Sequence, residues 1–158
     1  MKDATPWLDA EEQRLWRRWL LLHSRLTATL NRNLEADSGM SLQDFEVLAR
    51  LTDEATGKLR VTQLAFLLDW ERSRLSHHVR RMQRRGLVVR EECPDDNRGA
   101  FVVLTPAGRR AIEEAAPNHV RTVRRIVFDT LTADELQALD IINSKVLNRM
   151  QTPPTAGG

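Results

Sequence analysis

Residues 72–88 read RSRLSHHVRRMQRRGLV, and this stretch decides the fold. Leu75, Val79 and Met82 recur at the spacing of the buried face of a helix, and Gly86 predicts where that helix ends. On a helical wheel the opposite face is polar and basic, with Ser73, His77, Arg80 and Arg84 at its centre and Arg74, Ser76 and Arg81 beside them. The pattern predicts a helix that packs on one side and offers arginine, serine and histidine on the other.

The charge of the chain is concentrated around this helix. The formal net charge is only +2, but residues 57–110 carry +6, whereas residues 1–56 carry −3 and residues 111–158 carry −1. Seven arginines and no acidic residue lie between Arg72 and Arg90. A charge run is usually a solvated surface, but seven like charges without a counterion repel one another. This favours a surface that binds a polyanion.

The neighbouring segments complete a winged helix-turn-helix pattern. Residues 61–68 read as a short apolar helix, and residues 69–71 as a turn in which Trp70 is predicted to fill the core. Residues 87–91 and 100–104 are apolar, β-branched runs separated by CPDDNRG, which has the composition of a hairpin loop. A short helix, a turn, a basic helix and a two-stranded hairpin follow one another in winged proteins that place the second helix in the major groove of DNA.

The hairpin loop offers a second contact with DNA. Arg98, at the end of the loop, is placed to enter a minor groove, where negative potential is concentrated, and Asp96 could orient it. The alternative is a surface ion pair between these two residues, which contributes at most about 1 kcal/mol. The position in the wing favours the minor-groove role.

Further helices are predicted on both sides of the winged segment. Their starts are marked by three capping pairs: Asp9 with Glu12, Ser41 with Asp44, and Thr132 with Glu135. The first helix is expected over about 10–35, and the second to end near Thr52. Thr105 caps a further helix that begins at Pro106, and Pro117 is expected to kink that helix without ending it.

Three segments together resemble the MarR (multiple-antibiotic-resistance regulator) family of bacterial winged-helix transcription factors. They are PDDNRGAFVVLTPAGR at 94–109, RSRLSHHVRRMQRRGLV at 72–88 and SLQDFEVLARL at 41–51. The first looks like the wing signature of the family, on which Asp96, Arg98, Leu104, Thr105 and Gly108 fall. Two positions depart from the family pattern. Asn97 stands where many members carry arginine, and Arg60 where a capping serine or threonine is usual.

The resemblance implies a single unit over 1–158 that is mainly α-helical with a small β-hairpin wing. Dimerisation helices are expected at 9–37 and 106–150, a DNA-binding winged helix-turn-helix lobe at 41–105, and a disordered tail at 151–158. The implied molecule is a homodimer bound to a pseudo-palindromic operator in double-stranded DNA, acting as a repressor that a small, often phenolic or anionic, ligand releases. The long apolar helices indicate a partner chain independently, because a small winged lobe cannot bury them all.

Four residues are candidates for a ligand pocket: Trp16, Trp19, His23 and Phe45. Trp16 and His23 are seven residues apart and share one face of the first helix. Packing in the core or at a dimer interface is the favoured role of these aromatic residues. The alternative is an effector pocket in which His23 meets an anionic aromatic ligand.

Several function classes are disfavoured. No run approaches the roughly 18 apolar residues of a membrane span, and the N-terminus lacks signal-peptide character, so a cytoplasmic protein is expected. The adjacent His77 and His78 diverge on a helix, and Cys93 is the single cysteine, so neither a metal nor another cofactor is expected. No nucleophile motif or phosphate-binding loop suggests an enzyme. Two alternatives stay open: a winged protein-interaction module without specific DNA binding, and a redox-sensing regulator that uses Cys93.

Overall fold

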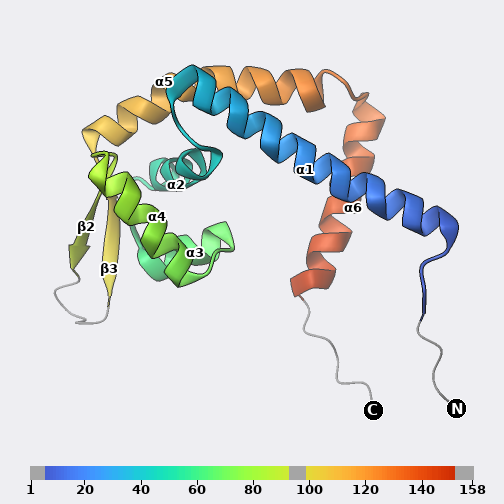
Figure 1. Cartoon of the computed structure of the whole chain (residues 1–158), viewed down its shortest axis with the longest axis horizontal. Helices are drawn as coiled ribbons and strands as arrows, with labels where there is room; N and C mark the ends of the chain where they lie inside the picture. The colour runs from blue at the N-terminus through green and yellow to red at the C-terminus, as the bar shows by residue number, and fades with distance from the viewer. Residues whose placement is uncertain (1–5, 93–98, 152–158) are drawn as a thin grey trace, which may run out of the picture. The chain divides into compact units, whose positions relative to one another are not determined.

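The structure is a computed structural model that describes residues 6–92 and 99–151 (Figure 1). It is mainly helical with one small antiparallel sheet, as the sequence predicts. The chain forms two compact units, of which the first ends at His119 and the second begins at Val120. The elements in chain order are α1 (Ala10–Ser38), α2 (Leu42–Asp53), β1 (Lys58–Arg60), α3 (Val61–Leu68), α4 (Arg72–Arg84), β2 (Val88–Glu92), β3 (Ala100–Leu104), α5 (Pro106–Val123), the π-helical segment η1 (Arg124–Phe128) and α6 (Ala133–Gln151).

The predicted capping pairs are confirmed. The Asp9 carboxylate accepts from the N–H groups of Glu11 and Glu12, and Ser41 and Asp44 cap each other reciprocally at the start of α2. Helix α1 runs three residues beyond its expected end, to Ser38. Gly39 is the residue that adopts the left-handed conformation, with φ +67°, and its N–H donates to the carbonyl oxygen of Glu35.

The two-stranded hairpin predicted from the sequence is present as β2 and β3, but the sheet has a third strand that was not predicted. Its order is β1–β3–β2, with Leu59 opposite Val102 on one side of β3 and Arg90 opposite Val102 on the other. Strand β1 is only three residues long, too short for a period of two to be visible in the sequence. Burial of Leu59 and the hydrogen bond from the Leu104 N–H to the Gly57 carbonyl hold β1 in place.

The core lies between α2, α3, α4 and the sheet. Helices α3 and α4 contact each other, α2 contacts α3, and α4 contacts β2. The largest fully buried side chains are almost all aliphatic: Val47, Leu48, Leu51, Leu59, Leu64, Leu75, Val79, Met82, Val88 and Val102. This packing fixes the orientation of α4, the helix on which the candidate contacts lie.

Thr105 and Gly108 join the start of α5 to the turn that follows α4. The Thr105 hydroxyl lies 2.7 Å from the Gly86 carbonyl oxygen, to which it can donate, and it accepts from the Gly108 N–H at 2.9 Å. A Cβ atom at Gly108 would lie 2.0 Å from the Leu87 carbonyl oxygen, closer than atoms can approach. The sequence motif LTPAG therefore encodes a close contact between backbones as well as a helix start.

The second unit, from Val120, contains the end of α5, η1 and α6. Pro117 lies inside α5 and does not end it, as predicted, but the π-helical segment after it had no signal in the sequence. Thr132 and Glu135 cap the start of α6 as predicted, with the Thr132 N–H donating to Glu135 Oε2 at 2.8 Å. No helix within the described residues is long and apolar enough to cross a membrane. Of the predicted disordered tail at 151–158, Gln151 is instead the last residue of α6, and residues 152–158 lie outside the described residues.

Replacing Gly108 by alanine is expected to destabilise the protein by about 2 kcal/mol or more, because the new Cβ must displace the Leu87 backbone. In an ordinary helix the same change stabilises by about 1 kcal/mol, so the sign of the effect is diagnostic. Urea unfolding followed by circular dichroism measures the difference. Arg110→Ala, at an exposed position of the same helix, is the control and should change stability by less than about 0.5 kcal/mol. A stabilised Gly108→Ala variant would contradict the close contact.

Candidate nucleic-acid interface

Helix α4 packs on the core through its apolar face, as predicted. Leu75, Val79 and Met82 are at most 2% exposed. The turn before the helix is built by Asp69, which adopts the left-handed conformation with φ +53°, and by the Trp70 N–H, which donates to the Ala65 carbonyl oxygen. The register of α4 is therefore set, and the orientation of every other side chain on it follows.

The side of α4 that faces solvent carries the outward stripe, which we define as Ser73, His77, Arg80 and Arg84. All four side chains are exposed, and they recur at intervals of four, three and four residues along one line of the helix. No hydrogen bond or ion pair joins any of them to another described residue. Their donors and their two guanidinium charges are available to a partner outside the chain.

A second line of residues on α4, the inner stripe, faces the start of α2. It consists of Arg74, His78, Arg81 and the C-cap residue Arg85, each one position after a member of the outward stripe. These side chains line a pocket of about 460 Å³ together with Gly39, Ser41, Asp44 and Trp70. Two of the arginines predicted to bind DNA, Arg74 and Arg81, belong to the inner stripe. The sequence pattern placed them beside the outer face.

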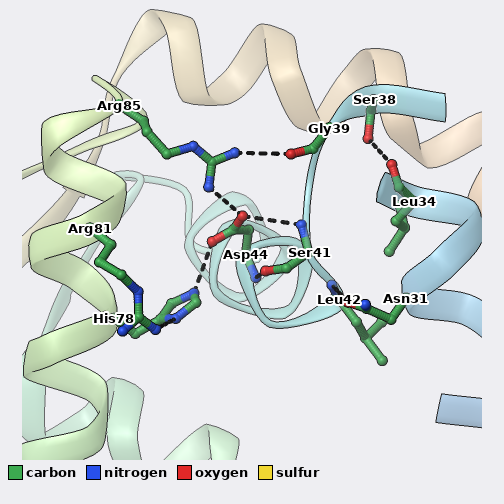
Figure 2. Close-up of polar contacts among 10 residues, drawn as sticks. All are labelled: Asn31, Leu34, Ser38, Gly39, Ser41, Leu42, Asp44, His78, Arg81 and Arg85. Atoms are coloured by element: carbon green, nitrogen blue, oxygen red, sulfur yellow. Dashed lines mark hydrogen bonds and ion pairs between the residues drawn. The ribbon is translucent and has the colours of Figure 1, made fainter. Parts of the chain in front are cut away.

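Asp44 is the centre of the inner stripe's contacts, as Figure 2 shows. Its Oδ2 atom accepts from Arg85 Nη1 at 2.5 Å and from the Ser41 N–H at 3.1 Å. Its Oδ1 atom lies 2.9 Å from Nε2 of His78, which has no well-aligned hydrogen-bond acceptor among the described residues, so this approach is an electrostatic contact. Arg85 also donates to the Gly39 carbonyl oxygen at 3.3 Å. One carboxylate thus joins α4 to the start of α2, and Arg85 extends the link to the end of α1.

The Asp44 carboxylate is almost completely buried, with 4% of the side chain exposed. Burial alone raises its pKa, but the contacts with His78 and Arg85 and the hydrogen bond from Ser41 outweigh burial and hold the pKa well below its usual range. Asp44 is therefore ionised at every pH at which the protein would work.

Two contacts orient the arginines of the inner stripe. The Arg74 guanidinium lies over the Trp70 ring, 4.3 Å from its centroid, and Nη2 of Arg81 lies 2.8 Å from Nδ1 of His78. Trp70 is half-buried, packs against the core and meets His78 edge to face, in line with the predicted core role. Ser76 is half-buried. The predicted wing residues Asp96 and Arg98, and also Cys93, lie outside the described residues.

A second pocket, of about 540 Å³, contains two of the four predicted ligand-binding residues, His23 and Phe45. Trp16 and Trp19 do not line it, and they are 52% and 40% exposed on α1. The Phe45 ring stacks on His119, with the centroids 4.3 Å apart. Burial lowers the pKa of His119 and raises that of Glu46, which also lines the pocket. The pocket therefore holds a half-buried histidine, whose neutral form burial favours, against an aromatic ring.

Sequence reasoning missed three functional details of this region. Asp44 was predicted only as a cap, Arg85 only as part of the basic run, and His119 was not singled out. Asp44 and Arg85 are 41 residues apart, so no local spacing could reveal their contact. Within the described residues, no three histidine, cysteine, aspartate or glutamate side chains converge as metal ligands would.

Asp44→Asn is expected to lower the free energy of unfolding by about 2 to 3 kcal/mol at pH 7, since it leaves Arg85 without its counter-charge and removes the carboxylate that lies against His78. The value is discounted for Arg85, whose side chain is 46% exposed. Because folding lowers the Asp44 pKa, the wild-type advantage should be complete above the unfolded value of about 4 and shrink as the pH falls below it. Urea unfolding at several pH values measures this, with the exposed Asp53→Asn as control. A difference that does not depend on pH would show that Asp44 contributes by shape alone.

Comparison with known proteins agrees with this geometry. A sequence model of the MarR family matches residues 38–99. The solved structure of Sco3205, a MarR family transcriptional regulator from Streptomyces coelicolor in complex with DNA, is 38% identical, with 97% of this chain and 96% of that chain covered and a TM-score of 0.89. AbsC, another MarR family transcriptional regulator from S. coelicolor, is 35% identical over 93% of this chain and 99% of its own, with a TM-score of 0.87. The transcriptional repressor MprA of Escherichia coli (strain K12) is 24% identical over 140 residues, which cover 89% of this chain and 78% of that protein. The chain belongs to the MarR family of transcriptional regulators.

Proposed function

We propose that the protein is a homodimer that binds a specific, pseudo-palindromic site in double-stranded DNA, represses transcription there and releases the DNA when a small ligand binds. The observation that carries the proposal is the outward stripe of α4. It presents two arginines without an ion-pair partner among the described residues, a serine and a histidine on a helix whose register is fixed by its buried face. A helix of this kind fits the major groove, where arginine can bind guanine or phosphate.

The contacts with DNA are assigned to both lines of α4 and to the wing. Ser73, His77, Arg80 and Arg84 face the groove, while Arg74, Ser76 and Arg81 lie at its edge, where phosphates pass. Asp96 and Arg98 are proposed to reach the neighbouring minor groove. The structure of the relative Sco3205 in complex with DNA supports DNA binding by this fold, since that protein has the same fold over nearly its whole length.

Large apolar side chains exposed at both ends of the chain support a dimer. On α1, Leu15, Trp16 and Leu22 are 52–63% exposed, and on α6 Leu147 and Met150 are 52% and 69% exposed. Side chains of this size are rarely left in water in such numbers on a stable monomer. A twofold partner that covers them would place two winged lobes on half-sites about one helical turn apart.

Repression and release by a ligand rest on separate observations. The relative MprA is a transcriptional repressor, which supports the same direction of control here. The pocket beside Phe45 and His23 combines apolar and aromatic walls with polar and charged side chains, among them Glu46, Arg50 and Asp53, and it is proposed to take a phenolic or anionic aromatic ligand. We assign Trp16 and Trp19 to the dimer interface, because they do not line this pocket.

The test is a fluorescence-anisotropy titration of the protein onto the DNA upstream of its own gene, with excess unrelated duplex as competitor. Saturable binding that survives the competitor, with two chains per duplex, is the expected result. Binding that the competitor abolishes would leave only the non-specific electrostatic contribution and would favour the interaction-module alternative. The same assay then measures release by phenolic anions.

Arg80→Ala and Arg84→Ala are each expected to weaken DNA binding by about tenfold or more and to reduce the slope of log affinity against log salt by about 1. Both residues are exposed on the outward stripe, so circular dichroism and thermal stability should stay unchanged. Arg110→Ala removes one exposed positive charge from α5 and is the matched control. Equal losses from all three variants would indicate a general charge effect and no specific interface on α4.

A further inference from the structure

The hydrogen-bond chemistry of the Arg81–His78 contact determines the protonation state of the histidine. Nη2 of Arg81 lies 2.8 Å from Nδ1 of His78, and a guanidinium group has only donors. Nδ1 must therefore accept, so it carries no proton. In the neutral ring the proton is then on Nε2, the atom that lies 2.9 Å from the Asp44 carboxylate (Figure 2). The chain of contacts from Asp44 through His78 to Arg81 exists only while the ring is neutral.

We propose that His78 is a positioning residue that holds Arg81 for its contact with DNA while its ring is neutral, so that proton uptake by His78 weakens specific DNA binding. The inference rests on the proposed function, because it concerns how tightly the protein binds its operator. His78 is only 7% exposed, because its side chain lies on the buried side of α4. It therefore acts through Arg81 and does not itself touch DNA.

The charges around His78 come from three elements. From α2, Asp44 touches the ring and Glu46 lies within electrostatic range, and from α1, Glu35 lines the same pocket. The positive charges are those of the inner stripe: Arg74, Arg81 and Arg85. A proton on Nδ1 would face the Arg81 guanidinium at hydrogen-bond distance, where two donors repel each other. Arg81 must then leave its position, while Asp44, which stays ionised, continues to hold the other side of the ring.

The sign of the effect separates this role from a simple charge effect. A histidine that merely adds positive charge near DNA raises affinity as the pH falls, and the exposed His77 on the outward stripe is expected to do so. If His78 positions Arg81, its protonation has the opposite effect, because the complex requires the neutral ring. The two adjacent histidines are therefore expected to shift DNA affinity in opposite directions.

The tautomer can be measured on the free, full-length protein by two-bond ¹H–¹⁵N correlation of the histidine rings at about pH 8, with His78→Asn used to assign the His78 signals. We expect the His78 ring as the Nε2–H tautomer, and we expect its Nδ1 shift to change in Arg81→Ala. An Nδ1–H tautomer, or a ring that does not respond to Arg81→Ala, would overturn the proposal without any reference to DNA.

The pH profile of DNA affinity tests the functional part, between about pH 8 and about pH 5, where histidine side chains gain a proton. All the variants compared carry His77→Gln, because this substitution removes the opposing contribution of His77 to the pH profile. In that background affinity is expected to fall by about tenfold towards low pH, the equivalent of one charge-assisted hydrogen bond. Adding His78→Asn, whose side-chain oxygen can accept from Arg81 at any pH, should abolish the fall and keep the affinity seen at high pH. Adding Arg81→Ala should lower the affinity at high pH and also abolish the fall.

His23, His119 and Glu46 are unchanged in all these variants. Any contribution from them to the pH profile of DNA affinity therefore cancels when the variants are compared. His78→Asn that leaves the pH profile unchanged would overturn the proposal while leaving the DNA-binding function intact. If the wild-type protein binds its upstream DNA at no pH, the proposed function fails and the role of His78 fails with it. Urea unfolding of each variant at both pH values identifies any loss of affinity that comes from unfolding.

Discussion

The buried carboxylate of Asp44 is the contact on which the arrangement of the winged lobe depends. It closes the capping box of α2, accepts from Arg85 at the end of α4 and lies against His78 in the middle of that helix. Burial of a charge is unfavourable unless it is paired, and here Arg85 and the Ser41 N–H donate to the carboxylate while His78 lies against it. Apolar packing of Leu75, Val79 and Met82 sets the register of α4, and the contacts of Asp44 with His78 and Arg85 add directional links between that helix and the start of α2.

This arrangement divides the arginines of α4 between two roles. The run of seven arginines looks like one basic surface in the sequence, yet Arg85 is paired with Asp44, Arg81 contacts His78 and Arg74 lies on Trp70. Arg80 and Arg84 have no such partner within the described residues. A shift of one position along the helix separates side chains with partners inside the chain from those of the outward stripe, and Arg81 is proposed to serve both roles, because His78 holds it for its contact with DNA.

Local signals in the sequence were sufficient for most of the fold. Capping pairs, the apolar stripe of α4 and the Thr105–Pro106 start of α5 each involve residues within a few positions of one another, and all are confirmed. Strand β1 was missed because three residues carry no period, and the π-helical η1 because no residue pattern marks it. The partners of Asp44 and the stacking of Phe45 on His119 depend on long-range folding, which spacing does not record. For the same reason the sequence could not separate the four candidates for a ligand pocket: His23 and Phe45 line it, whereas Trp16 and Trp19, for which packing was the favoured role, do not.

In the proposed complex, the outward stripe of α4 meets the DNA while the contacts of Asp44 with α4 persist. Backbone amide chemical shifts of the ¹⁵N-labelled protein, followed as operator duplex is added, test it most directly. The largest changes are expected at Ser73, His77, Arg80 and Arg84, with the Asp44 and Ser41 amides little affected because their contacts persist. Changes concentrated at α5 or at the exposed apolar face of α1, with α4 unaffected, would contradict it.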